Sequence, residues 1–212
     1  MPQLITDFIK AGKERILFVL LGNILLGFGV AVFKLAGLGN DPFDGMNMAL
    51  ADFFGMYYPL LQVLVNIGFF VIQIIWGRRL IGFGTIVNAF GLGYIVAFWI
   101  QVLGSFMSTP SLLILQLIMV VIGVLFCSLG LSMYQQADMG VAPYDALSII
   151  MNEKIRKLPY FWARMITDAG CALVCFLAGG LVGLGTIISA FCLGPVIHFF
   201  DLHVSKPILG RK

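Results

Sequence analysis

The chain of 212 residues is 60% hydrophobic and only 11% charged, and its formal net charge is +3. Soluble domains carry about 25% charged residues, so this composition excludes a water-soluble fold and predicts a chain that lies in a lipid bilayer. The composition also leaves no soluble domain for a cofactor, and the basic residues lack the aromatic interleaving that indicates nucleic-acid binding.

Six stretches are long and apolar enough to cross a bilayer, which takes about 20 residues. They are Ile16–Leu35, Tyr58–Trp76, Gly82–Leu103, Leu112–Tyr134, Tyr160–Ala178 and Leu181–Phe200. Two further segments, Pro42–Phe54 and Pro143–Met151, are too short to cross and predict re-entrant or interfacial half-helices. We therefore expect an all-α, polytopic membrane protein with a single membrane domain over residues 1–212. The first ten residues carry Asp7 and Lys10 and show no cleavable signal-peptide pattern.

The sequence repeats itself after a shift of 101 positions, with one copy at about residues 15–103 and the other at about 112–204. The segment from Gly39 to Asp44 aligns with the segment from Gly140 to Asp145, and nine of seventeen positions in 82–98 are identical in the second copy. Each copy holds three crossings, so the second copy is expected to insert upside down. Inverted repeats of this kind are typical of transporters, with the site where the halves meet.

The basic residues favour one orientation. With the N-terminus in the cytoplasm, twelve of the thirteen lie on the cytoplasmic side, and only Lys34 lies outside. The twelve are Lys10, Lys13, Arg15, Arg78, Arg79, Lys154, Arg156, Lys157, Arg164, Lys206, Arg211 and Lys212. Eight crossings would scatter this pattern, so we expect six spans and two cytoplasmic termini.

The repeated Gly-x-x-Pro-Phe/Tyr-Asp motif predicts the start of each short helix. Proline suits the first helical position, and Asp44 and Asp145 lie in the first turn, where the helix dipole favours an anion. In the first copy, either Asn40 or Asp41 is expected to be the N-cap. Asn47 shares a face with Asp44. The motif is explained either by a well-capped helix after a turn or by two short helices that enter the membrane from opposite faces and line a shared cavity.

A second repeated motif lies in the third and sixth spans, where Thr85 and Asn88 correspond to Thr186 and Ser189. Small residues at helical spacing accompany them, including Gly93 and its counterpart, and such residues let helices approach closely in lipid. The motif therefore indicates either helix packing or the lining of a cavity.

The fifth span carries two charged residues, Arg164 and Asp168, four positions apart on one face. Ionisable residues within a span are costly and usually functional, although an internal ion pair is the simpler explanation. The alternative is that Asp168 binds an amine, a cation or a proton. Asn66 lies at a similar depth in the second span and shares a face with Gln62; the two are also explained as hydrogen-bonding residues between helices.

No enzymatic pattern is apparent, and no catalytic or metal-binding residues are predicted. The four cysteines lie inside apolar spans and are best interpreted as small hydrophobic residues. The sequence lacks a P-loop, an HExxH motif and a dinucleotide fingerprint. We therefore expect neither an enzyme nor a cofactor.

The leading hypothesis is a transporter for a small solute, or the substrate-binding membrane subunit of a larger transporter. The candidate binding residues are Asp44, Asp145, Asp168, Asn47, Asn66, Asn88, Thr85, Thr186 and Ser189. The acids favour a cationic, amine-bearing or polyhydroxylated solute, whereas the helix N-termini favour an anion, so the sign of the solute stays open. The alternatives are a non-transporting accessory protein that docks to a partner, and a channel. The expected partners are the lipid bilayer, a small-molecule solute and either a second copy or a partner subunit.

The two motif copies, with Ala36-Gly37-Leu38-Gly39 before the first and Met139 before the second, resemble those of the YczE/YyaS/YitT-like bacterial integral membrane proteins. The Gly82-x-Gly84-Thr85 block and its copy also fit this group. The resemblance implies a small protein of the bacterial plasma (inner) membrane. Because the chain stops at Lys212, without the soluble C-terminal domain of YitT-type members, the resemblance favours the YczE-like branch.

Overall fold

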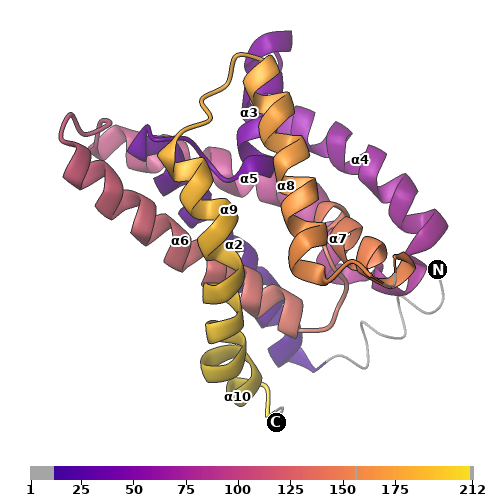
Figure 1. Ribbon diagram of the computed structural model, residues 1–212. Helices are drawn as coiled ribbons and strands as arrows, with labels where there is room; N and C mark the ends of the chain where they lie inside the picture. The colour runs from indigo at the N-terminus through magenta and orange to yellow at the C-terminus, as the bar shows by residue number, and fades with distance from the viewer. Residues whose placement is uncertain (1–11, 156, 211–212) are drawn as a thin grey trace.

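The computed structural model describes residues 12–155 and 157–210, and these are folded entirely into helices and connecting turns (Figure 1). Six helices are long and apolar enough to cross a membrane, which confirms the predicted number. They are α2 (Lys13–Ala36), α4 (Tyr58–Trp76), α5 (Phe83–Phe106), α6 (Leu113–Gln136), α8 (Tyr160–Leu177) and the continuous helix Leu184–Ile208, which begins with α9 (Leu184–Phe200).

The remaining elements are short. A 3-10 turn, η1 (Arg78–Leu80), links α4 to α5, and α9 continues through a π-helical turn, η2 (Asp201–Ser205), into α10 (Lys206–Ile208). The two predicted half-helices are α3 (Pro42–Phe54) and α7 (Pro143–Lys154). Asp7, Lys10, Arg156, Arg211 and Lys212, which entered the sequence analysis, lie outside the described residues.

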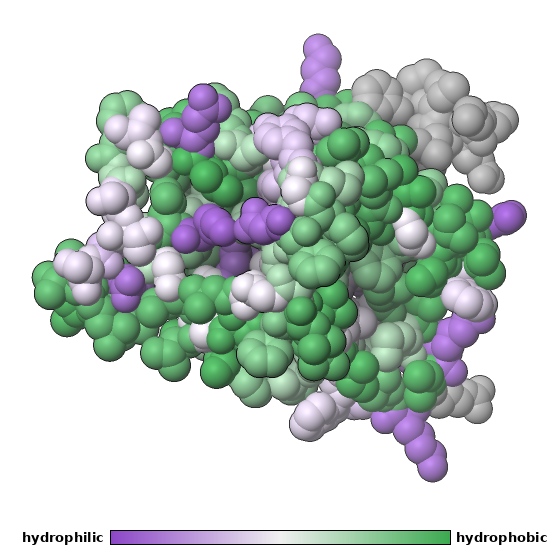
Figure 2. Space-filling model, turned by 90° about the horizontal axis from the view of Figure 1, so that it is seen from above, coloured by the Kyte–Doolittle hydropathy of each residue, from purple (hydrophilic) through white to green (hydrophobic). Residues whose placement is uncertain are grey.

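The surface is largely apolar, as a lipid-facing protein requires. Large hydrophobic side chains are exposed along most of the spans, among them Phe106, Ile114 and Leu177 at 83%, 67% and 72%. Figure 2 shows hydrophobic residues over most of the visible face, with hydrophilic residues in a few separate places. Lipid tails take the place of water around this surface, which explains why the composition excludes a soluble fold.

The central pair of helices is α2 and α6, which pack along most of their length. A Cβ atom added at Gly22 would lie 2.8 Å from the carbonyl oxygen of Gly130, and one added at Gly29 would lie 3.0 Å from that of Gly123. Contacts that advance along one helix while they retreat along the other mean that the helices are antiparallel. Because glycine has no side chain, the two backbones touch at both places, as in other small-residue interfaces in membranes.

The loop before each short helix packs against the start of a span from the other half of the chain. The Gly84 N–H donates to the Met139 carbonyl at 2.7 Å, and the Gly185 N–H donates to the Leu38 carbonyl at 2.8 Å. A shift of 101 positions converts each hydrogen bond into the other. The two halves are therefore interlocked by equivalent contacts, and these contacts fix where α3 and α7 begin.

The start of α3 follows the predicted capping chemistry. Asp41 is the N-cap, and its Oδ1 accepts a hydrogen bond from the Asp44 N–H at 3.2 Å. Pro42 and Pro143 occupy the first turns of α3 and α7. The glycine before each helix, Gly39 or Gly140, has φ of +102° or +100°, which other residues rarely adopt.

Candidate binding chamber between the short helices

The N-terminal turns of α3 and α7 meet inside the protein. The rings of Phe43 and Tyr144, at corresponding positions of the repeat, stack with their centroids 4.3 Å apart and their planes 11° from parallel. Span α8 packs against both short helices, and α4 does the same. The two short helices thus start from one buried place and are enclosed by spans of both halves.

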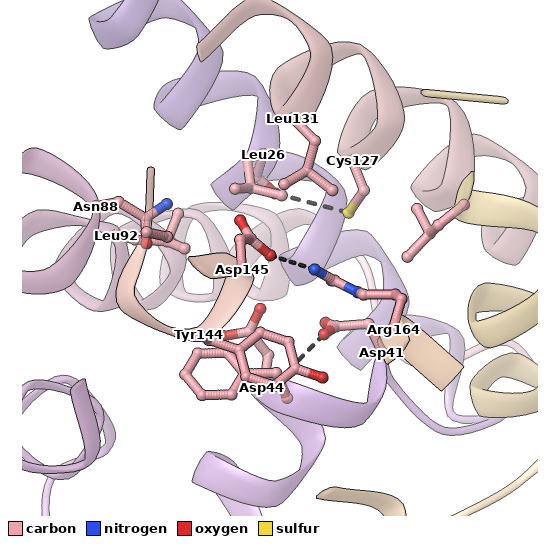
Figure 3. A pocket seen from close by; sticks show the side chains of 13 residues that line it. Leu26, Asp41, Asp44, Asn88, Leu92, Cys127, Leu131, Tyr144, Asp145 and Arg164 are labelled. Carbon is pink, nitrogen blue, oxygen red and sulfur yellow. Dashed lines mark hydrogen bonds and ion pairs between the residues drawn. The ribbon is translucent and has the colours of Figure 1, made fainter. Parts of the chain in front are cut away.

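A small cavity of about 40 Å³, which we call the chamber, lies at this meeting point (Figure 3). Its polar lining comes from Asp41, Asp44, Asn88, Asp145 and Arg164. Its remaining lining is Leu26, Phe43, Leu92, Cys127, Leu131, Ala142, Tyr144 and Leu193. In Figure 3 the Asp145 and Arg164 side chains point toward one another across the chamber, and Asp41, Asp44 and Tyr144 lie together beside them.

Asp44 is held by neutral donors from α4. The Tyr58 hydroxyl donates to its Oδ1 at 2.8 Å, and Gln62 Nε2 donates to the same oxygen at 2.7 Å. Asp44 is only 4% exposed and Gln62 only 1%. These two hydrogen bonds join the first short helix to the span that follows it.

Asp145, the counterpart of Asp44, is held partly by a charge. Its carboxylate accepts hydrogen bonds from the Tyr134 hydroxyl and from Arg164 Nη1. Arg164 Nε lies 3.4 Å from Asp168 Oδ1, so one guanidinium is shared by two carboxylates. Asp168 also accepts a hydrogen bond from the Tyr144 hydroxyl, and the guanidinium carbon lies 4.9 Å from the centre of the Tyr144 ring. The predicted Arg164–Asp168 contact is therefore one side of a larger buried network.

The chamber has more hydrogen-bond acceptors than donors. Three carboxylates line it, and its single guanidinium is already shared by Asp145 and Asp168. Asp41 Oδ2 is buried and has no hydrogen-bond partner among the described residues. A buried acceptor without a partner is costly, and a ligand that donates hydrogen bonds or carries positive charge would satisfy it.

A larger cavity of about 520 Å³, the α8–α9 vestibule, adjoins the chamber. Leu131, Arg164 and Leu193 line both cavities. The vestibule is lined mainly by apolar residues of α6, α8 and α9, and Asp168 and Asp201 contribute carboxylates to it. The chamber therefore has a neighbouring space that is wide enough for an organic group.

The predicted site residues fall into two groups. Asp44, Asp145 and Asn88 line the chamber, and Asp168 lies beside it, in the α8–α9 vestibule. Of the other five, four make hydrogen bonds within or between helices, and the Thr186 hydroxyl makes none among the described residues. Asn47 and Ser189 donate to carbonyls of their own helices, Asn66 donates to the Ala89 carbonyl at 3.4 Å, Thr85 donates to the Val141 carbonyl at 2.8 Å, and Thr186 Oγ1 is buried without a partner among the described residues.

Asp41, which lines the chamber, and three residues that donate hydrogen bonds to its carboxylates were not among the predicted set. Asp41 was considered only as one of two candidate N-caps, and Gln62 only as a hydrogen-bonding residue between helices. Tyr58 and Tyr134 were not singled out, although a tyrosine near or within an apolar span needs a partner for its hydroxyl group when it is buried. This requirement indicates that each tyrosine has a hydrogen-bond partner, but it does not predict which residue the partner is.

Comparison with known proteins gives a family but no activity. A family model described as "Family of unknown function (DUF6198)" matches residues 13–202. An uncharacterized protein of Haemophilus influenzae is 25% identical over 197 residues, which cover 92% of this chain and 87% of the relative. The uncharacterized protein YyaS of Bacillus subtilis is 27% identical over 191 residues, 90% of this chain and 92% of YyaS. The uncharacterized membrane protein YczE of the same species is 25% identical over 184 residues, 86% of this chain and 83% of YczE. No solved structure matches the chain.

Proposed function

The chain belongs to the DUF6198 family and is related to YyaS and YczE, and we propose that it transports a small organic solute that carries a cationic nitrogen. One observation carries this proposal: Asp44 and Asp145, at equivalent positions of the two sequence copies, line the same buried chamber. Short or broken helices at matching positions of two halves are the strongest structural pointer to a transporter site.

The charge balance of the chamber supports a cationic solute. Arg164 is already shared by two carboxylates, so it offers little to an anion. The N-terminus of α3, which would otherwise attract an anion, is occupied by the Asp41 cap. Asp41 and Asp44 remain as acceptors, and an ammonium group supplies both the charge and the donors that they lack. The adjoining vestibule would take the apolar part of the solute.

The antiparallel contacts of α2 and α6 and the paired hydrogen bonds of Gly84 and Gly185 support an arrangement in which the two halves are inverted repeats. In this arrangement both termini lie in the cytoplasm of a bacterial cell. The basic residues of the described chain favour the same orientation, because they gather at the ends of the spans that would face inward. The α8–α9 vestibule then opens toward the cytoplasm.

Uptake by proteoliposomes tests the proposed function. The purified protein is reconstituted, and the uptake of a panel of radiolabelled primary and quaternary amines is compared with that of carboxylates of similar size. We expect saturable uptake of at least one amine. Asp44→Asn is expected to reduce its uptake by about tenfold or more, because a charged hydrogen bond contributes about 1.5–3 kcal/mol.

Glu14→Gln is the matched control. It also replaces a carboxylate by an amide, but Glu14 is exposed, in the first turn of α2. This variant is expected to take up the amine at the parent rate. If neither amines nor carboxylates accumulate above empty liposomes, the transport proposal fails. Conductance that does not saturate with solute concentration would instead identify a channel.

A further inference from the structure

A second vestibule lies across the protein from the first. This α4–α5 vestibule has a volume of about 330 Å³ and is lined by Lys34, Met48, Asp52, Tyr57, Tyr58, Pro59, Ala97, Ile100 and Gln101. Five of these nine residues have repeat counterparts that line the α8–α9 vestibule. The pairs are Lys34 with Gln135, Met48 with Ile149, Pro59 with Tyr160, Ala97 with His198 and Ile100 with Asp201. The two cavities are therefore equivalent places in the two halves.

The two vestibules lie on opposite sides of the protein. Lys34 is near the C-terminal end of α2, and Gln135 is near the C-terminal end of α6. Because α2 and α6 are antiparallel, these ends point to opposite faces of the membrane. Each vestibule is thus placed to admit a solute from a different side.

Only one vestibule reaches the chamber. The α8–α9 vestibule shares Leu131, Arg164 and Leu193 with it. Among the described residues, none that lines the α4–α5 vestibule also lines the chamber. Tyr58, on the vestibule side, is instead hydrogen-bonded to Asp44, on the chamber side.

Two equivalent glycines show that α4 packs against α5 more closely than α8 packs against α9. A Cβ atom added at Gly93 of α5 would lie 2.3 Å from Gln62 Oε1 of α4, so these two spans are in close contact. Its counterpart Gly194 of α9 has nothing within 4 Å of such an atom. The spans α4 and α5 are thus closed upon each other, whereas α8 and α9 are separated at the same place.

We infer that the protein alternates between this state and an opposite one, in which α8 closes on α9 at Gly194 and α4 leaves α5, so that the chamber opens to the α4–α5 vestibule. The inference rests on the proposed transport function. It assigns Tyr58, Gln62 and Gly93 to the gate that is closed here. Breaking the hydrogen bonds of Tyr58 and Gln62 to Asp44 opens this gate, and the closure of Gly194 seals the other side.

Thiol accessibility tests the inference. Leu92 lines the chamber and is only 4% exposed, so Leu92→Cys is introduced into a background whose four native cysteines are replaced by alanine. Its rate of modification by a membrane-impermeant reagent is measured from the α4–α5 side. Tyr58→Phe with Gln62→Leu is expected to raise this rate about tenfold, because two hydrogen bonds no longer hold the gate closed. Gly194→Leu is expected to lower the rate, because a bulky side chain holds α8 away from α9.

Gly104→Leu is the control, since nothing lies within 4 Å of a Cβ atom at Gly104 either and this position lines neither vestibule. This variant should leave the labelling rate unchanged. A labelling rate that responds to neither gate variant would overturn the inference. The assay needs no solute, so the two proposals can fail separately. If labelling responds as expected but no uptake is found, only the transport function is contradicted. If uptake is saturable but labelling does not respond, only the alternation is contradicted.

Discussion

The two halves of this protein share a sequence pattern but differ in how they hold their equivalent acids. In the first half, Asp44 accepts hydrogen bonds from the uncharged side chains of Tyr58 and Gln62, and α4 packs closely against α5. In the second half, Asp145 is paired with Arg164, and α8 and α9 enclose a vestibule. The comparison teaches that a duplicated scaffold can keep its backbone contacts while its charges concentrate in one copy.

The largest expected effect comes from removing the charge of the second half. Arg164→Leu leaves Asp145 and Asp168 buried without their shared cation, and breaking a buried pair costs about 3–5 kcal/mol. Gln62→Leu removes one hydrogen bond from an uncharged donor to Asp44, and a side-chain hydrogen bond between helices contributes about 0.6 kcal/mol in a membrane protein. Unfolding in detergent, followed by circular dichroism, should therefore show a much lower stability for Arg164→Leu. Equal losses in the two variants would mean that the halves do not differ in this way.

The equivalent glycines give a smaller effect. Gly93→Leu forces a side chain against Gln62 and Pro59, and overpacking of this kind costs about 1–3 kcal/mol. Gly194→Leu enters open space and should change stability by less than about 0.5 kcal/mol. The midpoints of thermal unfolding of the two variants check this difference. A destabilised Gly194→Leu would show that α8 and α9 are packed as closely as α4 and α5.

The smallest effect is expected at the equivalent threonines. The Thr85 hydroxyl donates to the Val141 carbonyl, whereas Thr186 Oγ1 is buried without a partner among the described residues. Thr85→Val should cost about 0.6 kcal/mol, and Thr186→Val should be neutral or slightly stabilising, because it removes an unsatisfied group. Chemical unfolding of both variants in one detergent resolves the sign. A greater loss in Thr186→Val would contradict the contacts described for the two loops.

The number of spans and both half-helices could be predicted, because a span needs only length and apolar composition. The N-cap of α3 could be predicted only to Asn40 or Asp41, because both precede Pro42 in the chain, and the structure selects Asp41. The Arg164–Asp168 contact followed from helical spacing, but the contact of Arg164 with Asp145 joins two helices, and no local rule supplies it.

The packing of small residues was predicted only in part. The spacing of Ala and Gly in the third and sixth spans indicated close packing at Gly93 and at Gly194, and only Gly93 makes such a contact. The four glycines between α2 and α6 were not singled out, although Gly22 corresponds to Gly123 and Gly29 to Gly130. Which of two equivalent interfaces is closed depends on the state of the whole protein, and a sequence shared by both states does not specify it.

The inverted arrangement of the halves is tested most directly by the ends of the two short helices. Phe53 and Lys154 are equivalent positions, both exposed, so each can be replaced by cysteine and treated in intact cells with a membrane-impermeant thiol reagent. We predict that Phe53→Cys is modified in intact cells and that Lys154→Cys is modified only after the membrane is permeabilised. Modification of both cysteines from the same side would contradict the inverted repeat, and with it the chamber as a meeting place of two opposed halves.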